Sequence, residues 1–261
     1  MRLQVRTDLR FDADATVPSV FMLRPRSGAG QWVVVERYVV EPSVPAEEFV
    51  DTYGNLCQRL TLPEGSSSVQ VTAEVETSAT IDTAPGAAPS PIETLPAGVL
   101  AYLLPSRYCP SDRLGDRALE IVGTAAPGYD QVEAVRAWIH DEVTYEYGTS
   151  DASSDALTTL DRMEGVCRDF THLGVALCRA LSIPARMVVG YLHGLDPMDQ
   201  HAWFEAFVAG RWYTFDATQP APRGGRVVIG YGRDAADVAF STQFGPARLV
   251  EMAVSVERLD G

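Results

Sequence analysis

The first part of the chain alternates between apolar and polar residues with the period of a β-strand. The stretch SVQVTAEVET places Val69, Val71, Ala73 and Val75 on one face, because side chains of an extended strand point alternately to its two sides. The stretch WVVVERYVV, which begins at Trp32, is an apolar, β-branched run of strand length. The first eighty or so residues therefore predict an all-β region.

A segment rich in proline separates this region from the rest of the chain. It reads SATIDTAPGAAPSPIETLP and then YLLPSRYCP, between positions 78 and 110. Proline fixes φ and removes a backbone donor, so neither a helix nor a central strand runs through such a segment. We expect a domain boundary near Pro91, with an N-terminal β-rich domain at 1–90 and a second domain at 91–261.

Helical periodicity begins after this boundary. In YDQVEAVRAWIHDEV the apolar residues recur at steps of three and four: Val132, Val135, Ile139 and Val143. Further helices are expected around DRLGDRALEIVG and from Ser154 to about Met163. Helices are therefore expected in the second part of the chain.

The stretch EGVCRDFTHLGVALCRALSIP predicts a helix with a cysteine in its first turn. Its apolar stripe comprises Phe170, Leu173, Gly174, Leu177, Cys178 and Leu181, and Pro184 prevents continuation. Cys167 falls on the same stripe, after a flexible turn at Gly165. The free N–H groups and the positive end of the helix dipole stabilise a thiolate there, and the thiolate is the nucleophilic form. Cys178, three turns further on, is expected to be a buried packing residue.

The chain has four histidines, of which one is placed for chemistry. His140 and His172 are expected at the surface or in a supporting role, because they lie on the polar sides of their helices. His193 lies in the loop YLHGLDPMD and is expected near the mouth of a cleft. His201 begins the stretch HAWFEAFVAGRWYTFDATQ.

This stretch predicts a β-hairpin that brings a histidine and an aspartate together. Ala209 and Gly210 form the turn, so that Val208 pairs with Arg211. His201 and Asp216 then share a face as diagonal neighbours, close enough for a hydrogen bond. A loop with an odd number of residues and no bulge would separate them.

Cysteine, histidine and aspartate are the residues that nucleophilic acyl transfer requires. The thiolate of Cys167 attacks a carbonyl, His201 holds and later delivers the proton, and Asp216 orients the ring. The backbone N–H of Cys167 is placed to stabilise the oxyanion. Three candidates for a second oxyanion donor remain open at this point: Tyr145, Tyr147 and Trp203.

Composition and spacing exclude several other classes of protein. The net charge of −14 would repel a phosphate backbone, so no nucleic acid partner is expected. No apolar run approaches the roughly 18 residues of a membrane span, and the N-terminus lacks a secretory pattern. Four cysteines without a tight CxxC pair predict reduced thiols in a cytoplasm. The sulfurs of Cys167 and Cys178 lie too far apart on one helix to share a metal ion with His172, and no cofactor is expected.

GVCRDFTHLGVALCRALSIPARMVVGYL and HAWFEAFVAGRWYTFDATQ resemble the core of the bacterial transglutaminase-like superfamily, in its cysteine protease branch with an N-terminal β-domain. DTYGNLCQRL and GRDAADVAF resemble that branch's N-terminal and C-terminal segments. The resemblance implies a papain-like α+β fold with Cys167 as nucleophile, His201 as general base and acid, and Asp216 as the orienting carboxylate. Arg168 departs from the many relatives that have a neutral or amide side chain beside the cysteine; it is either solvated or adds positive charge near the thiolate.

We therefore expect a cysteine-dependent amide hydrolase, a peptidase or amidase, that acts on a peptide or small amide through a thioester acyl-enzyme. One alternative is a transglutaminase or other acyltransferase to an amine acceptor. Another is a protein-interaction module that has the fold but no chemistry. The oligomeric state stays open.

Overall fold

The computed structural model describes residues 1–28 and 30–259. Its N-terminal region consists of β-strands, as the alternating pattern predicts. Its strands are β1 (Arg2–Ala13), β2 (Val17–Phe21), β3 (Gln31–Glu41), β4 (Ala46–Val50), β5 (Leu56–Leu62) and β6 (Gly65–Thr77). Val69, Val71, Ala73 and Val75 are all buried on one face of β6.

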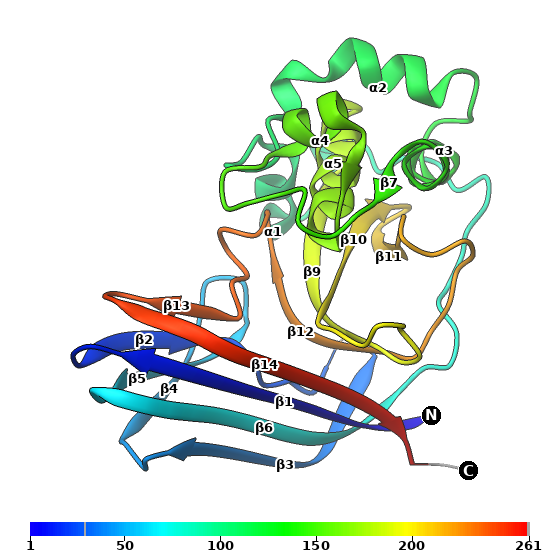
Figure 1. The fold of residues 1–261 in the computed structure, drawn as a ribbon. Helices are drawn as coiled ribbons and strands as arrows, with labels where there is room; N and C mark the ends of the chain where they lie inside the picture. Colours follow the sequence, from blue (N-terminus) through cyan, green and yellow to red (C-terminus); the bar gives the residue numbers. More distant parts are fainter. Residues whose placement is uncertain (29, 260–261) are drawn as a thin grey trace.

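Two four-stranded antiparallel sheets form this region, and the end of the chain returns to complete both. The strand orders are β14-β1-β6-β3 and β13-β2-β5-β4, where β13 is Ser241–Gln243 and β14 is Ala247–Arg258. Figure 1 shows β14 lying along β1 although the two strands are at opposite ends of the sequence. The extent of the predicted domains, 1–90 and 91–261, stays a prediction, but the strand pairing places residues 241–258 with the N-terminal sheets.

The middle of the chain forms helices around a third sheet. The helices are α1 (Ala97–Leu100), α2 (Gly115–Val122), α3 (Tyr129–Glu142), α4 (Ala156–Arg162) and α5 (Cys167–Ala180), with short 3-10 turns at Ile92–Thr94, Ala101–Leu103 and Ser111–Arg113. The sheet has the order β11-β10-β9-β12, from β9 (Ala185–Leu192), β10 (His201–Val208), β11 (Arg211–Phe215) and β12 (Arg226–Gly232). A short parallel pair, β7 (Thr144–Tyr145) and β8 (Glu164–Gly165), lies beside the start of α5.

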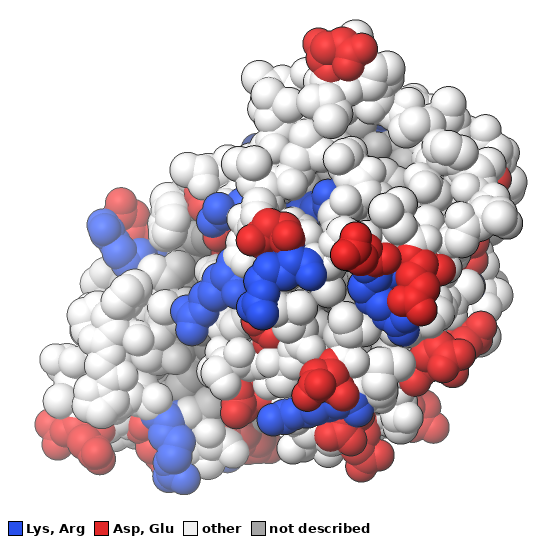
Figure 2. Space-filling model, turned by 90° about the horizontal axis from the view of Figure 1, so that it is seen from above, with Lys and Arg blue, Asp and Glu red and all other residues white. Residues whose placement is uncertain are grey.

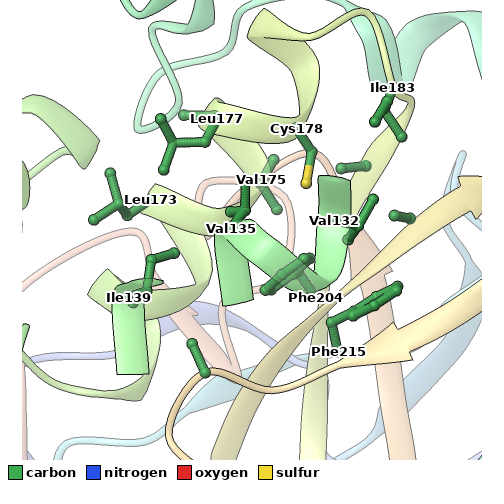
Figure 3. Close-up of a cluster of buried hydrophobic side chains, with 14 of the residues drawn as sticks. Val132, Val135, Ile139, Leu173, Val175, Leu177, Cys178, Ile183, Phe204 and Phe215 are labelled. Atoms are coloured by element: carbon green, nitrogen blue, oxygen red, sulfur yellow. The ribbon is translucent and has the colours of Figure 1, made fainter. Parts of the chain in front are cut away.

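Helices α3 and α5 pack against one face of this sheet. Figure 3 shows side chains of both helices converging on Phe204 and Phe215 of the sheet. The predicted stripe of α3 is buried along its whole length, and so is that of α5 from Phe170 to Cys178. Gly174 lets α5 approach β10 closely, since a Cβ there would lie 2.6 Å from a ring carbon of Phe204.

The opposite face of the sheet packs against the N-terminal region. Apolar side chains from both sides form one cluster, which includes Leu3, Val5, Ala73, Val75, Met187, Tyr191, Ala202 and Val227. Two hydrogen bonds reinforce this contact. The side-chain N–H of Gln31 donates to the carbonyl of Val228 at 2.8 Å, and its side-chain oxygen accepts from the N–H of Val228 at 2.7 Å. All eight residues of β10 are consequently buried.

Both signs of charge occur on the face of the molecule that Figure 2 shows. On the face seen in Figure 2, the basic side chains lie among acidic ones and form no continuous basic surface. Within the described part of the chain, the helices are all too short or too polar to cross a membrane.

Candidate active site

Cys167 is the first residue of α5, and neighbouring residues fix this helix start. The carboxylate of Asp169 accepts a hydrogen bond from the backbone N–H of Val166 at 2.9 Å, which closes the first turn. Gly165 is required because a Cβ at this position would lie 2.7 Å from that of Asp169. Cys167 itself is partly exposed, while the two residues that lock the turn, Gly165 and Asp169, are buried.

The hairpin that carries the other two candidates has the predicted register. Val208 pairs with Arg211, and the turn residues Ala209 and Gly210 have φ of 49° and 81°. Nε2 of His201 lies 2.8 Å from Oδ2 of Asp216, which confirms the predicted hydrogen bond between diagonal neighbours.

His201 begins β10 and is 4% exposed. Burial by itself disfavours its charged form, but the charge and hydrogen bond of Asp216, followed by those of Cys167, raise the pKa of His201 to about 9. Because Nε2 contacts the carboxylate, Nδ1 is the ring nitrogen left for the thiol. The three predicted residues therefore meet: Cys167 at the start of a helix, His201 at the start of a strand and Asp216 after the next strand.

Two residues that the sequence analysis did not identify hold Asp216 in place. Nη2 of the buried Arg226 donates to Oδ2 of Asp216 at 2.8 Å, and Thr218 donates to Oδ1 from its N–H at 3.0 Å and its hydroxyl at 2.7 Å. Burial favours the neutral acid, but His201, Arg226 and Thr218 hold the pKa of Asp216 well below its usual range. The sequence offered one signal for Arg226: this arginine begins the apolar strand RVVIGYG. An arginine that becomes buried in such a strand requires a charged or polar partner.

A hollow of about 340 Å³ opens beside this group. Its lining comes from three parts of the chain: His201 and Thr218 of the paired group, the aromatic residues Tyr145, Tyr147 and Phe170, and the loop residues Leu195, Asp196, Pro197, Asp199 and Gln200. His140 also lines it, in a supporting position, with Nδ1 3.0 Å from the carbonyl oxygen of Ala217. His193 is half-buried in its loop, and its backbone N–H donates to the carbonyl of Gly225.

We expected His172 either at the surface or in a supporting role. The prediction of a surface position is wrong. Its side chain is fully buried, stacks on Tyr108 at 5.0 Å and accepts a hydrogen bond at Nε2 from the N–H of Ala235. Burial lowers the pKa of His172 to about 4. The polar side of α5 is covered by the segments around residues 108 and 235, which periodicity along the helix does not reveal.

Arg168 is partly exposed beside Cys167, and an effect of its charge on the thiolate stays a prediction. Its guanidinium donates to the carbonyl of Asp151 at 2.6 Å and pairs with the buried carboxylate of Asp169. It therefore ties the start of α5 to the preceding loop.

The other three cysteines are enclosed. Burial raises the pKa of Cys57 to about 11 and those of Cys109 and Cys178 to about 12. Cys178 is thus the packing residue that the sequence predicted. In residues 1–28 and 30–259, no group of three His, Cys, Asp or Glu side chains is arranged to hold a metal ion.

A helix that starts with a cysteine, packed on a sheet that presents a paired histidine and aspartate, defines the class of transglutaminase-like and papain-like proteins. Residues 115–217 match the family model of the transglutaminase-like superfamily, and residues 1–78 match that of the bacterial transglutaminase-like N-terminal region. The chain belongs to the transglutaminase-like superfamily, with a bacterial N-terminal β-region.

Individual relatives extend over nearly the whole chain. An uncharacterized protein of Mycobacterium tuberculosis is 30% identical over 276 residues, which cover 91% of this chain and 84% of the relative. An uncharacterized protein of Mycobacterium leprae is 28% identical over 255 residues, which cover 92% of this chain and 90% of the relative. A crystal structure described as a "Putative Cysteine Protease" from Cytophaga hutchinsonii superposes with a TM-score of 0.92 at 36% identity, over all of this chain and 91% of that one.

Proposed function

We propose that this protein is a cysteine-dependent amide hydrolase, a peptidase or amidase, in which Cys167, His201 and Asp216 act as a catalytic triad. The observation that carries the proposal is the buried hydrogen bond between His201 and Asp216, with the ring held against the thiol at the start of α5. The structural neighbour from Cytophaga hutchinsonii, which is described as a cysteine protease, supports the same class of enzyme.

The reaction follows from the protonation states of these groups. The Cys167 thiolate attacks the amide carbon, a C–S bond forms, and the carbonyl π electrons move to oxygen. His201 carries the proton and gives it to the leaving nitrogen as the C–N bond breaks. Water then attacks the thioester carbon while His201 takes its proton; the C–S bond breaks, the acid leaves, and the thiolate and protonated His201 are restored. Asp216 stabilises the imidazolium and fixes the ring throughout.

An amine in place of water would make the same acyl-enzyme a transglutaminase or acyltransferase. The assay that separates the two adds a primary amine such as glycine ethyl ester to a panel of peptide amides and small amides. None of the 261 residues is lysine, so the protein offers no lysine side chain of its own as an acceptor. Amine incorporated at the expense of free acid would favour transfer, and unchanged release of free acid favours hydrolysis.

The proposal requires that turnover depend on Cys167. Cys167→Ala should lower turnover by at least about 10⁴-fold, because the nucleophile is lost, and its melting temperature should stay close to that of the wild type. Cys178→Ala, on the same helix but in the core, is the matched control and should retain activity. Equal turnover by Cys167→Ala would refute the triad, and no turnover by the wild type on any member of the panel would favour a non-catalytic interaction module.

We also propose a peptide or small amide as the partner rather than nucleic acid, since acidic residues outnumber basic ones by 35 to 21. Four free cysteines support a reducing compartment, the cytoplasm, as the location.

A further inference from the structure

Tyr145 is held at the start of α5 by its backbone. It belongs to β7, which pairs in parallel with β8, the strand that leads into Cys167. The N–H of Thr144 donates to the carbonyl of Met163 at 2.9 Å, and the N–H of Glu146 donates to that of Gly165 at 3.0 Å. These two hydrogen bonds flank Tyr145 and fix its distance from the helix start.

The side chain of Tyr145 turns toward the reacting atoms. Its ring packs against Phe170, with centroids 5.6 Å apart, and its hydroxyl oxygen faces the backbone N–H of Cys167. The same hydroxyl contacts that of Tyr147. Tyr145 lines the hollow that His201 also lines. The residue is 39% exposed.

We propose that Tyr145 is a further catalytic residue, the second donor of the oxyanion hole, a proposal that rests on the acyl-transfer function above. When the Cys167 sulfur attacks the carbonyl carbon, the oxygen that gains the electron pair lies between the Cys167 N–H and the Tyr145 O–H. Both groups donate to it, and neither loses its proton.

The chemistry of the hydroxyl suits this role. Burial, followed by the nearby Cys167 and Tyr147, raises the pKa of Tyr145, so the hydroxyl keeps its proton at neutral pH. A protonated phenol is a donor, whereas a phenolate would repel the developing negative charge.

The other two candidates fit less well. Nε1 of Trp203 is buried, the Trp203 ring lies under the guanidinium of Arg226 at 4.8 Å, and this tryptophan lines a different hollow from His201. Tyr147 lines the same hollow, but it is 54% exposed, and its hydroxyl contacts that of Tyr145.

Two reactions of Cys167 separate the oxyanion hole from the reactivity of the thiol. Acylation by p-nitrophenyl acetate passes through an oxyanion, whereas alkylation by iodoacetamide does not. Tyr145→Phe should slow acylation by about 10²-fold, the usual effect of losing one oxyanion donor, and leave the alkylation rate unchanged. Tyr147→Phe tests the competing candidate: it should slow acylation less than Tyr145→Phe does and should leave the alkylation rate unchanged.

Three results would overturn the assignment. Acylation of Tyr145→Phe at the wild-type rate would show that the hydroxyl does not stabilise the oxyanion. An equal fall in both rates would mean that Tyr145 only positions the thiol, and a loss of acylation confined to Tyr147→Phe would assign the donor to Tyr147. If the ester fails to acylate wild-type Cys167 while iodoacetamide alkylates it, the proposed function itself fails, and this appears before any variant is made.

Discussion

Asp216→Asn removes the charge that controls His201 while keeping the shape of the side chain. In the wild type the pKa of His201 is about 9, against an ordinary 6.5, because Asp216 and then Cys167 overcome the effect of burial. The difference of about 2.5 pKa units corresponds to about 3 kcal/mol of preference for the charged ring, at about 1.4 kcal/mol per unit. Without the carboxylate charge, burial prevails, and the pKa of His201 should fall below 6.5.

The same shift fixes the sign of the stability change. A histidine whose pKa is raised on folding contributes stability that is fully present below about pH 6.5 and is lost as the pH rises through about 9. Asp216→Asn should therefore lower the free energy of unfolding most strongly below pH 6.5. The part of this decrease that is due to His201 should disappear between pH 6.5 and 9.

NMR of ring-labelled histidine measures this directly, because the chain has only four histidines. His172, with a pKa of about 4, serves as an internal reference that the substitution should not move. Cys167→Ala is the control, and its His201 should keep a pKa well above 6.5, because Asp216 is the larger cause. A pKa that stays near 9 in Asp216→Asn would refute the reasoning.

Three further predictions follow from the site and the core. Iodoacetamide at neutral pH should alkylate Cys167 faster than the three buried cysteines, as peptide mass spectrometry would show; equal or slower labelling contradicts this. Amide cleavage should decline as the pH rises through about 9, because His201 then loses the proton that the leaving amine needs, whereas a pH-rate profile still level above that point would count against this role. Gly174→Ala should lower the free energy of unfolding in urea by about 1–3 kcal/mol, since its Cβ meets the Phe204 ring; Gly98→Ala, which has open space, should not.

Local patterns sufficed to predict the elements that carry the three central residues. The alternation around His201 and the two-residue turn at Ala209 and Gly210 fix which side chains share a face, so the approach of His201 to Asp216 followed from counting along one hairpin. Likewise, the apolar stripe of α5 predicted the face that packs against the sheet. These are short-range relations, and the sequence contains them.

Contacts between distant segments were not predictable in this way. Arg226 reaches Asp216 from β12, and Tyr145 reaches the start of α5 through a strand pair of only two residues. The burial of His172 depends on segments more than sixty positions away on both sides of it in sequence. Such contacts depend on how the elements pack together, which periodicity along one element does not specify.

The most direct test of the central claim is to trap the acyl-enzyme. An amide substrate from the panel is mixed with the protein, the reaction is quenched in acid during turnover, and the cysteine-containing peptides are analysed by mass spectrometry. We predict an acyl group on Cys167, as a thioester that hydroxylamine removes, in the wild type and not in His201→Ala. Turnover that proceeds with Cys167 unmodified, or with the acyl group on another residue, would contradict it.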